Sequence, residues 1–136
     1  MKSNYLKNYP KKPAKARSDR ILDPKYPFDY HAFEYNSIAV LILDATPIHN
    51  LDKLYVMKGT ECRGVIEPMF FTRTGKYLFQ LMTYSDQTEE TGLHLEYYSF
   101  KRKTVQTYHG WTFNVNEIIG HPESPMLINF DKIRGI

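Results

Sequence analysis

Apolar and aromatic residues recur almost without pause from Val65 to Phe113, and only short polar turns interrupt them. Within this span apolar and polar positions often alternate, and an alternation of period two is typical of β-strands. We therefore predict a mainly β domain, built as a single antiparallel curled sheet or a small open barrel, with one or two short helices. The alternative is an α+β sandwich in which a helix over residues 50–58 covers one face of the sheet.

Two strands are predicted outside this span. The run from Ser37 to Asp44 contains a β-branched stretch that is apolar on both faces, which is typical of a central strand. Residues 126–130 (MLINF) form the second predicted strand, close to the end of the chain.

Residues 50–58 are ambiguous. Asn50 suits a helix cap, and Asp52 suits the first turn. Gly59 suits the position just after a helix, so a helix is slightly favoured. The stretch 54–57 (LYVM) also fits a strand.

A first hairpin is predicted over residues 61–85. Its first strand, residues 61–72, contains Pro68, which cannot donate to a ladder and therefore indicates an edge or a bulge. A three-residue turn at 73–75 would set Phe71 opposite Tyr77. The expected core face of this hairpin holds Met69, Phe71, Tyr77, Phe79 and Leu81.

A second hairpin is predicted over residues 93–113, with a three-residue turn at 101–103. Opposite residues share a face, so odd positions would pair with odd ones and form the core face. This register sets Leu93 against Trp111 and Leu95 against His109. The other face would hold His94, Glu96, Tyr98, Phe100, Gln106, Tyr108 and Thr112.

Two connecting segments are also predicted. Residues 85–92 are polar and acidic, which indicates a solvated loop. Asn114, with Glu117 three residues later and Gly120 beyond, predicts a short helix.

Positive charge is concentrated at the N-terminus. Residues 1–20 carry seven basic residues and one acidic residue, a balance of +6, whereas the rest of the chain carries eleven basic and fourteen acidic residues, a balance of −3. Pro10 and Pro13 interrupt any helix there. We therefore divide the chain into a basic extended arm, residues 1–20, and a single β-rich domain, residues 21–136, whose first part, 21–36, is a strap rich in aromatic residues and proline.

Two groups of residues are candidates for binding a partner. On the second hairpin, aromatic residues that could stack on bases stand beside basic residues that could follow phosphates, as in proteins that hold single-stranded nucleic acid. These residues are Tyr98, Phe100, Lys101, Arg102, Lys103 and Tyr108. The arm adds Lys2, Lys7, Lys11, Lys12, Lys15, Arg17 and Arg20, which could neutralise phosphates or dock on an acidic protein or an anionic membrane. The competing interpretation is that the hairpin face packs under the strap or against a protein partner.

The sequence gives little support for catalysis, metal or cofactor binding, or membrane insertion. Cys62 is the single cysteine, and we interpret it as a half-buried strand residue. The five histidines have no metal-binding spacing, and no catalytic or nucleotide-binding motif is present, so we expect no enzyme, no metal site and no cofactor. The longest apolar run, residues 38–43, is too short to span a bilayer. Without a secretory signal, we expect an intracellular protein, cytoplasmic or of a virion or host cytoplasm.

These observations predict a non-catalytic interaction module that docks into a larger protein or nucleoprotein assembly. Two alternatives stay open. One is a protein-only binder, such as a viral or bacterial inhibitor or adaptor of a host protein. The other is a small-ligand-binding protein or enzyme with its site between the strap and the sheet.

Overall fold

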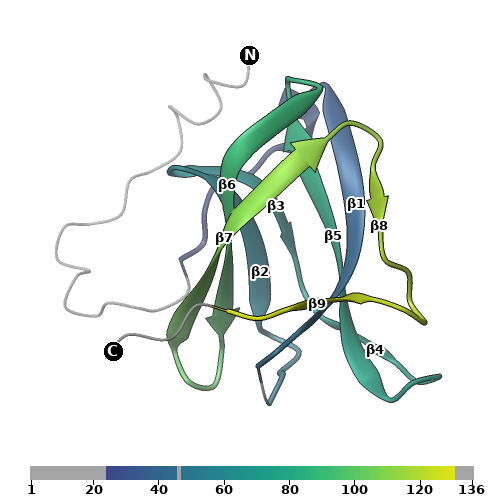
Figure 1. The fold of residues 1–136 in the computed structure, drawn as a ribbon. Coiled ribbons are helices and arrows are strands. Elements are labelled where there is room, and N and C mark those ends of the chain that lie inside the picture. Colours follow the sequence, from purple (N-terminus) through teal and green to yellow (C-terminus); the bar gives the residue numbers. More distant parts are fainter. Residues whose placement is uncertain (1–23, 46, 131–136) are drawn as a thin grey trace, which may run out of the picture.

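The computed structural model describes residues 24–45 and 47–130, which form two β-sheets (Figure 1). The mainly β prediction is confirmed, but two sheets replace the single curled sheet, and they do not close into a barrel. The described residues contain one helical element, the short 3-10 turn Tyr30–Ala32. The predicted α-helices, and with them the α+β alternative, are therefore wrong for this part of the chain.

The first sheet is organised around β1 (Tyr35–Leu43), the predicted central strand. One edge of β1 pairs antiparallel with β5 (Lys76–Ser85), which in turn pairs with β4 (Met69–Phe71). Its other edge pairs in parallel with two short strands from the end of the chain, β8 (Ile118–Ile119) and β9 (Met126–Ile128). The predicted last strand is thus confirmed, in a shorter form.

The second sheet has the order β3 (Glu61–Ile66), β2 (Lys53–Lys58), β6 (Glu89–Ser99) and β7 (Thr104–Asn114). The slightly favoured helix over residues 50–58 is wrong, because this segment contains β2. Leu54 and Val56 of β2 lie in the core between the sheets, whereas Tyr55 and Met57 lie in a second cluster on the outer face. A strand buries both faces in this way, which a short surface helix does not.

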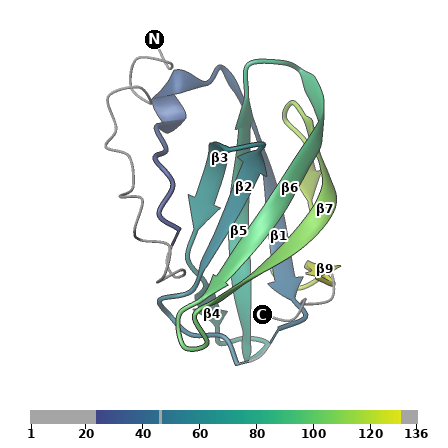
Figure 2. The same ribbon diagram turned by 90° about the vertical axis from the view of Figure 1, so that its left-hand side faces the viewer.

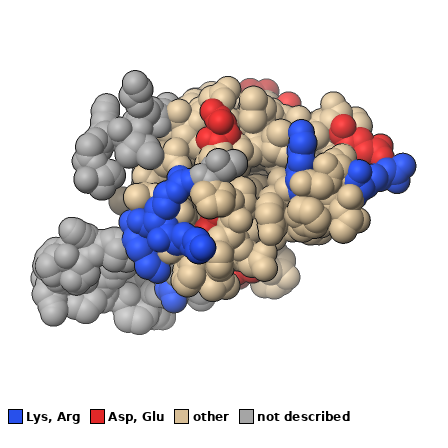
Figure 3. Space-filling model, turned by 90° about the horizontal axis from the view of Figure 1, so that it is seen from below, with Lys and Arg blue, Asp and Glu red and all other residues tan. Residues whose placement is uncertain are grey.

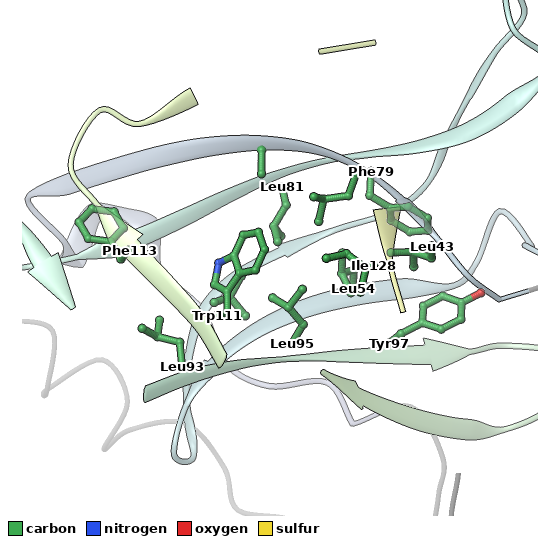
Figure 4. Close-up of a cluster of buried hydrophobic side chains, with 13 residues drawn as sticks. Leu43, Leu54, Phe79, Leu81, Leu93, Leu95, Tyr97, Trp111, Phe113 and Ile128 are labelled. Atoms are coloured by element: carbon green, nitrogen blue, oxygen red, sulfur yellow. The ribbon is translucent and has the colours of Figure 1, made fainter. Parts of the chain in front are cut away.

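The main core fills the space between the two sheets (Figure 4). Its largest fully buried side chains include Tyr97, Phe79 and Phe113. The two sheets lie against each other where β3 passes β5. A Cβ at Gly64 would lie 2.1 Å from the carbonyl oxygen of Met82, so only glycine permits this approach.

Pro68 divides the predicted first strand in two. Residues before it form β3 of the second sheet, and residues after it form β4 of the first sheet, so each piece is an edge strand. The β4–β5 turn contains four residues, 72–75, and sets Phe71 opposite Lys76 rather than Tyr77. The predicted core face is therefore wrong for Met69, which is 46% exposed, but right for Phe79 and Leu81.

The second hairpin also has a four-residue turn, residues 100–103, so odd positions near the turn face even ones. Leu95 lies opposite Tyr108, and His94 lies opposite His109, which corrects the predicted pairing of Leu95 with His109. A β-bulge follows, in which Gly110 has a φ of +90°. The extra residue restores the predicted pairing of Leu93 with Trp111.

Two connecting segments differ from their predictions. The acidic loop is shorter than expected, because β6 begins at Glu89. The segment after Asn114 is a turn rather than a helix: Asn116 has a φ of +61° and its N–H donates to the carbonyl of Asn36. That bond directs the chain along β1, where it forms β8 instead of a helix.

Residues 24–34 of the strap run beside the second sheet, and its last two residues, 35 and 36, begin β1 (Figure 2). Tyr26 and Phe28 pack against the outer cluster of Tyr55, Met57, Cys62 and Tyr98. The Tyr26 and Tyr55 rings meet edge to face, with centroids 5.0 Å apart. The outer face of β2 is therefore covered by the chain's own N-terminal segment.

Candidate functional site

Three consecutive basic side chains, Lys101, Arg102 and Lys103, are exposed on the β6–β7 turn. We call them the basic tip. Seen from below, lysine and arginine side chains gather over this end of the molecule (Figure 3). They were predicted from the sequence as a turn, and the structure places them at the end of the second sheet.

A buried carboxylate holds the tip from beneath. Asp52 is fully buried and accepts hydrogen bonds from the backbone N–H groups of His49 and Phe100, each at 2.8 Å, and from the Tyr97 hydroxyl. Burial, followed by the hydrogen bond to Asp52, raises the pKa of Tyr97 well above its ordinary value. The hydroxyl therefore remains protonated and donates to Asp52, which fixes the start of the turn.

The turn itself is tightly bonded. The Lys103 N–H donates to the Ser99 carbonyl at 2.8 Å, and the Arg102 N–H donates to Ser99 Oγ at 3.2 Å. Lys103 has a φ of +57°, which favours glycine, yet it carries a long basic side chain. Its Nζ lies 4.1 Å from the centroid of the Phe100 ring, and that ring stacks on His49.

A groove with a volume of about 730 Å³ lies between the strap and the same end of the second sheet. Lys53, in β2, pairs with Tyr98 in β6. The next residue of β6, Ser99, pairs with Thr104 and closes the β6–β7 hairpin. The groove and the basic tip therefore share one end of the sheet. The groove is lined by Lys25, Tyr26, Lys53, Tyr55, Val65, Ile66, Glu67 and Pro68.

The predicted aromatic surface is not a single surface. Tyr98 is 3% exposed and packs in the outer cluster beneath the strap. Tyr108 packs against the main core, where its ring centroid lies 6.5 Å from that of Trp111. Only Phe100, which is half-buried, stays beside the basic tip. Tyr98 thus fits the competing interpretation, because the strap covers it.

The predicted basic arm lies outside the described residues, so the structure does not place its seven cations. A site between the strap and the sheet was one alternative from the sequence, and the groove lies there, but its lining residues were not named. Lys53 would have been found if residues 50–58 had been interpreted as a strand beside the hairpin. The position of Lys25 and Tyr26 depends on tertiary packing of the strap, for which the sequence offers no local signal.

A second polar cluster lies on the outer face, where Glu96 joins the strap to β6. The Tyr26 hydroxyl donates to Glu96 Oε1 at 2.6 Å, and His94 Nε2 lies 2.9 Å from Glu96 Oε2. Burial, together with this carboxylate, raises the pKa of Tyr26. The His94 and His109 rings are 5.8 Å apart, so His109 lies on this face and not on the core face. This cluster anchors the strap.

The Cys62 thiol and the potential metal ligands bear on whether this protein could perform nucleophilic or metal chemistry. Burial raises the pKa of the Cys62 thiol to about 11, so the sulfur is protonated near neutral pH and is a poor nucleophile. Among residues 24–45 and 47–130, no three His, Cys, Asp or Glu side chains are grouped so that they could hold a metal ion.

Within the same described part, no helix has the length and apolar character needed to cross a membrane. No protein-family model, curated protein or solved structure matches the chain.

Proposed function

We propose that this protein is a non-catalytic interaction module that docks into a larger assembly by binding a polyanionic partner, with nucleic acid as the favoured chemistry. The observation that carries the proposal is the basic tip, which holds Lys101, Arg102 and Lys103 on a turn fixed by the buried Asp52. A turn whose backbone is already fixed loses less conformational freedom on binding than a mobile loop that carries the same cations.

Charge at this end of the sheet supports the same function. Lys25 and Lys53 line the adjoining groove, where Glu67 is the single carboxylate among the lining residues. Asp52 is close to the tip, but it already accepts three hydrogen bonds inside the protein. Phosphates bound here would release counterions, so the affinity should fall steeply with salt.

The basic arm, residues 1–20, is the second part of the proposal. Its seven cations would add phosphate contacts without sequence preference. Deleting residues 1–20 should therefore weaken binding at low salt and reduce its salt dependence. Equal binding by full-length and arm-deleted protein would remove the arm from the proposed function.

The test of the tip is a titration of the full-length protein into a fluorescently labelled single-stranded RNA, followed by anisotropy at several salt concentrations. The variant K101S/R102S leaves the Lys103 backbone and the Asp52 contacts in place. It should weaken binding about tenfold and lower the slope of log K against log salt by about 2, roughly 1 for each lost phosphate contact.

A matched control exists at the other exposed turn. Arg73 and Lys76 lie at the β4–β5 turn, and R73S/K76S removes the same charge as the tip variant. Arg73 pairs with Glu123 at 2.9 Å, but this is an exposed ion pair of little energetic weight. Binding by R73S/K76S should stay within about twofold of the wild type. Equal losses of affinity in both variants would mean that net charge alone determines binding, and this would overturn the proposal.

A second candidate function, binding of a protein partner, has an observation of its own. β4 is the outermost strand of its sheet, and its Met69 and Phe70 side chains are 46% and 50% exposed. Exposed apolar side chains on an unpaired edge suit pairing with a strand of another protein. A partner that is captured from the native source after nuclease treatment, and is lost with M69S/F70S, would favour this function.

A further inference from the structure

The groove between the strap and the second sheet combines an apolar wall with charged side chains. Val65, Ile66 and Pro68 supply the wall, and the strap supplies the Tyr26 ring. Tyr26 is held in place because its hydroxyl donates to Glu96 at 2.6 Å and its ring meets Tyr55 edge to face. The ring is therefore a fixed surface.

Both charge types stand in the same groove. Lys25 and Lys53 bring ammonium groups from the strap and from β2, and Glu67 brings an exposed carboxylate from the β3–β4 connection. Lys25 also has a φ of +39°, a conformation that residues other than glycine seldom adopt. A ligand with an anionic group, a flat or apolar body and a hydrogen-bond donor would complement these lining residues.

We propose that this groove binds one unstacked nucleotide of a single-stranded RNA or DNA, with the base against the Tyr26 side of the groove and a phosphate near Lys53 and Lys25. This inference rests on the proposed function, since the flanking phosphates would meet the basic tip at the same end of the sheet. The groove volume of about 730 Å³ falls in the range of small-ligand sites, ~300–1,000 Å³.

Glu67 distinguishes a nucleotide from an acidic peptide. A carboxylate inside the groove repels a ligand whose side chains are all anionic. It accepts hydrogen bonds from the amino groups of cytosine, adenine or guanine, as acidic side chains do when they read cytosine N4. Uracil and thymine lack that amino group. The groove should therefore prefer amino-bearing bases.

The test compares short oligo(rC) and oligo(rU), each of about 12 nucleotides, in anisotropy titrations with the full-length protein. The wild type should bind oligo(rC) about fivefold more tightly than oligo(rU). E67Q should reduce that ratio to less than about twofold without weakening oligo(rU) binding, since the amide keeps the size and loses the charge. E123Q neutralises an exposed carboxylate that pairs with Arg73. It should leave the ratio of oligo(rC) to oligo(rU) affinity unchanged.

A second variant tests the phosphate. K53Q should weaken oligo(rC) and oligo(rU) equally, by about threefold or more, because a phosphate contact carries no base information. If wild type and E67Q bind both oligonucleotides alike while K101S/R102S still loses affinity, the groove proposal fails and the proposed function stands. If K101S/R102S also binds like the wild type, both the groove proposal and the proposed function fail. Tighter binding of an acidic peptide than of oligo(rC), abolished by K53Q, would assign the groove to a protein ligand instead.

Discussion

Arg63 and Glu90 form a two-point ion pair, with Nη1–Oε1 and Nη2–Oε2 distances of 2.7 and 3.0 Å. Both side chains are more than nine-tenths buried. Arg63 also donates to the carbonyl of Tyr84 at 3.1 Å, and Ser85 Oγ donates to Glu90 at 2.6 Å. The pair therefore joins β3, β5 and β6 where the two sheets meet. The Arg63 guanidinium also lies 5.3 Å from the Phe33 ring centroid, so it holds the strap as well.

This pair predicts a loss of stability in acid. The hydrogen bond from Arg63 lowers the pKa of Glu90 in the folded protein below its ordinary value. A lowered pKa means that the stabilisation is fully present above the unfolded value, about 4.3, and is lost as the pH falls through the folded value. The free energy of unfolding, from urea titrations, should therefore decline below about pH 5 and do so less steeply in E90Q than in the wild type. The exposed neighbour variant E89Q should keep the wild-type slope; identical slopes in E90Q and wild type would contradict this role of Glu90.

Asp52 should be required for both stability and the geometry of the tip. D52A leaves three donors without their acceptor, including the Phe100 N–H and the Tyr97 hydroxyl, and should reduce the free energy of unfolding by about 3 kcal/mol. D52N keeps one acceptor oxygen and should cost about half as much. D44N, which alters an exposed carboxylate at the start of the same loop, should cost less than about 0.5 kcal/mol. Chemical denaturation measures all three, and a D52A cost as small as that of D44N would refute the role of Asp52.

Gly64 should tolerate no side chain. An added Cβ would lie 2.1 Å from the Met82 carbonyl oxygen, which belongs to backbone and cannot turn away, so G64A should cost about 3 kcal/mol or more. G59A is the comparison. Gly59 has a φ of +62° but no heavy atom within 4 Å of such a Cβ, so only the backbone strain of about 1 kcal/mol applies. Thermal unfolding should rank wild type, G59A and G64A in that order, and a G64A variant as stable as G59A would mean that β3 and β5 are further apart.

Lys103 should trade stability for binding. Its φ of +57° is strained for lysine, so K103G should raise the free energy of unfolding by up to about 1 kcal/mol. The same change removes a tip cation and its contact with the Phe100 ring, so RNA affinity should fall by about threefold. Denaturation and anisotropy on one protein preparation separate the two effects. A K103G protein that is more stable and binds as tightly as the wild type would exclude Lys103 from the interface.

The sequence predicted the strands that have strong local patterns, such as β1 and the two arms around the basic tip. The prediction failed at residues 50–58 because the residues that suggested a helix have other roles in the fold. Asp52 accepts hydrogen bonds from Tyr97 and Phe100, which are distant in the sequence, and Gly59 forms the β2–β3 turn with a φ of +62°. Local propensity does not report such long-range contacts.

The candidate site was also predictable only in part, because local sequence patterns do not report long-range contacts. The three basic residues of the tip are adjacent in the chain, so they were found. The predicted face of Tyr108 was wrong because a four-residue turn shifts the register there, and the bulge at Gly110 restores it only from Trp111 onward; neither changes the apolar pattern visibly. The groove joins Lys25 to Lys53 and Glu67, and only the folded strap brings Lys25 to the other two.

The most direct test of the proposed function is an NMR titration of isotope-labelled full-length protein with unlabelled oligo(rC), followed through backbone amide shifts. The proposed function predicts that, within the described domain, the largest changes fall on residues 100–103 and diminish as salt is added. The groove proposal adds changes on Lys25 and Tyr26, on Lys53 and on residues 65–67. Changes confined to the β4–β5 turn, or no saturable change in the domain at low salt, would contradict the proposed function.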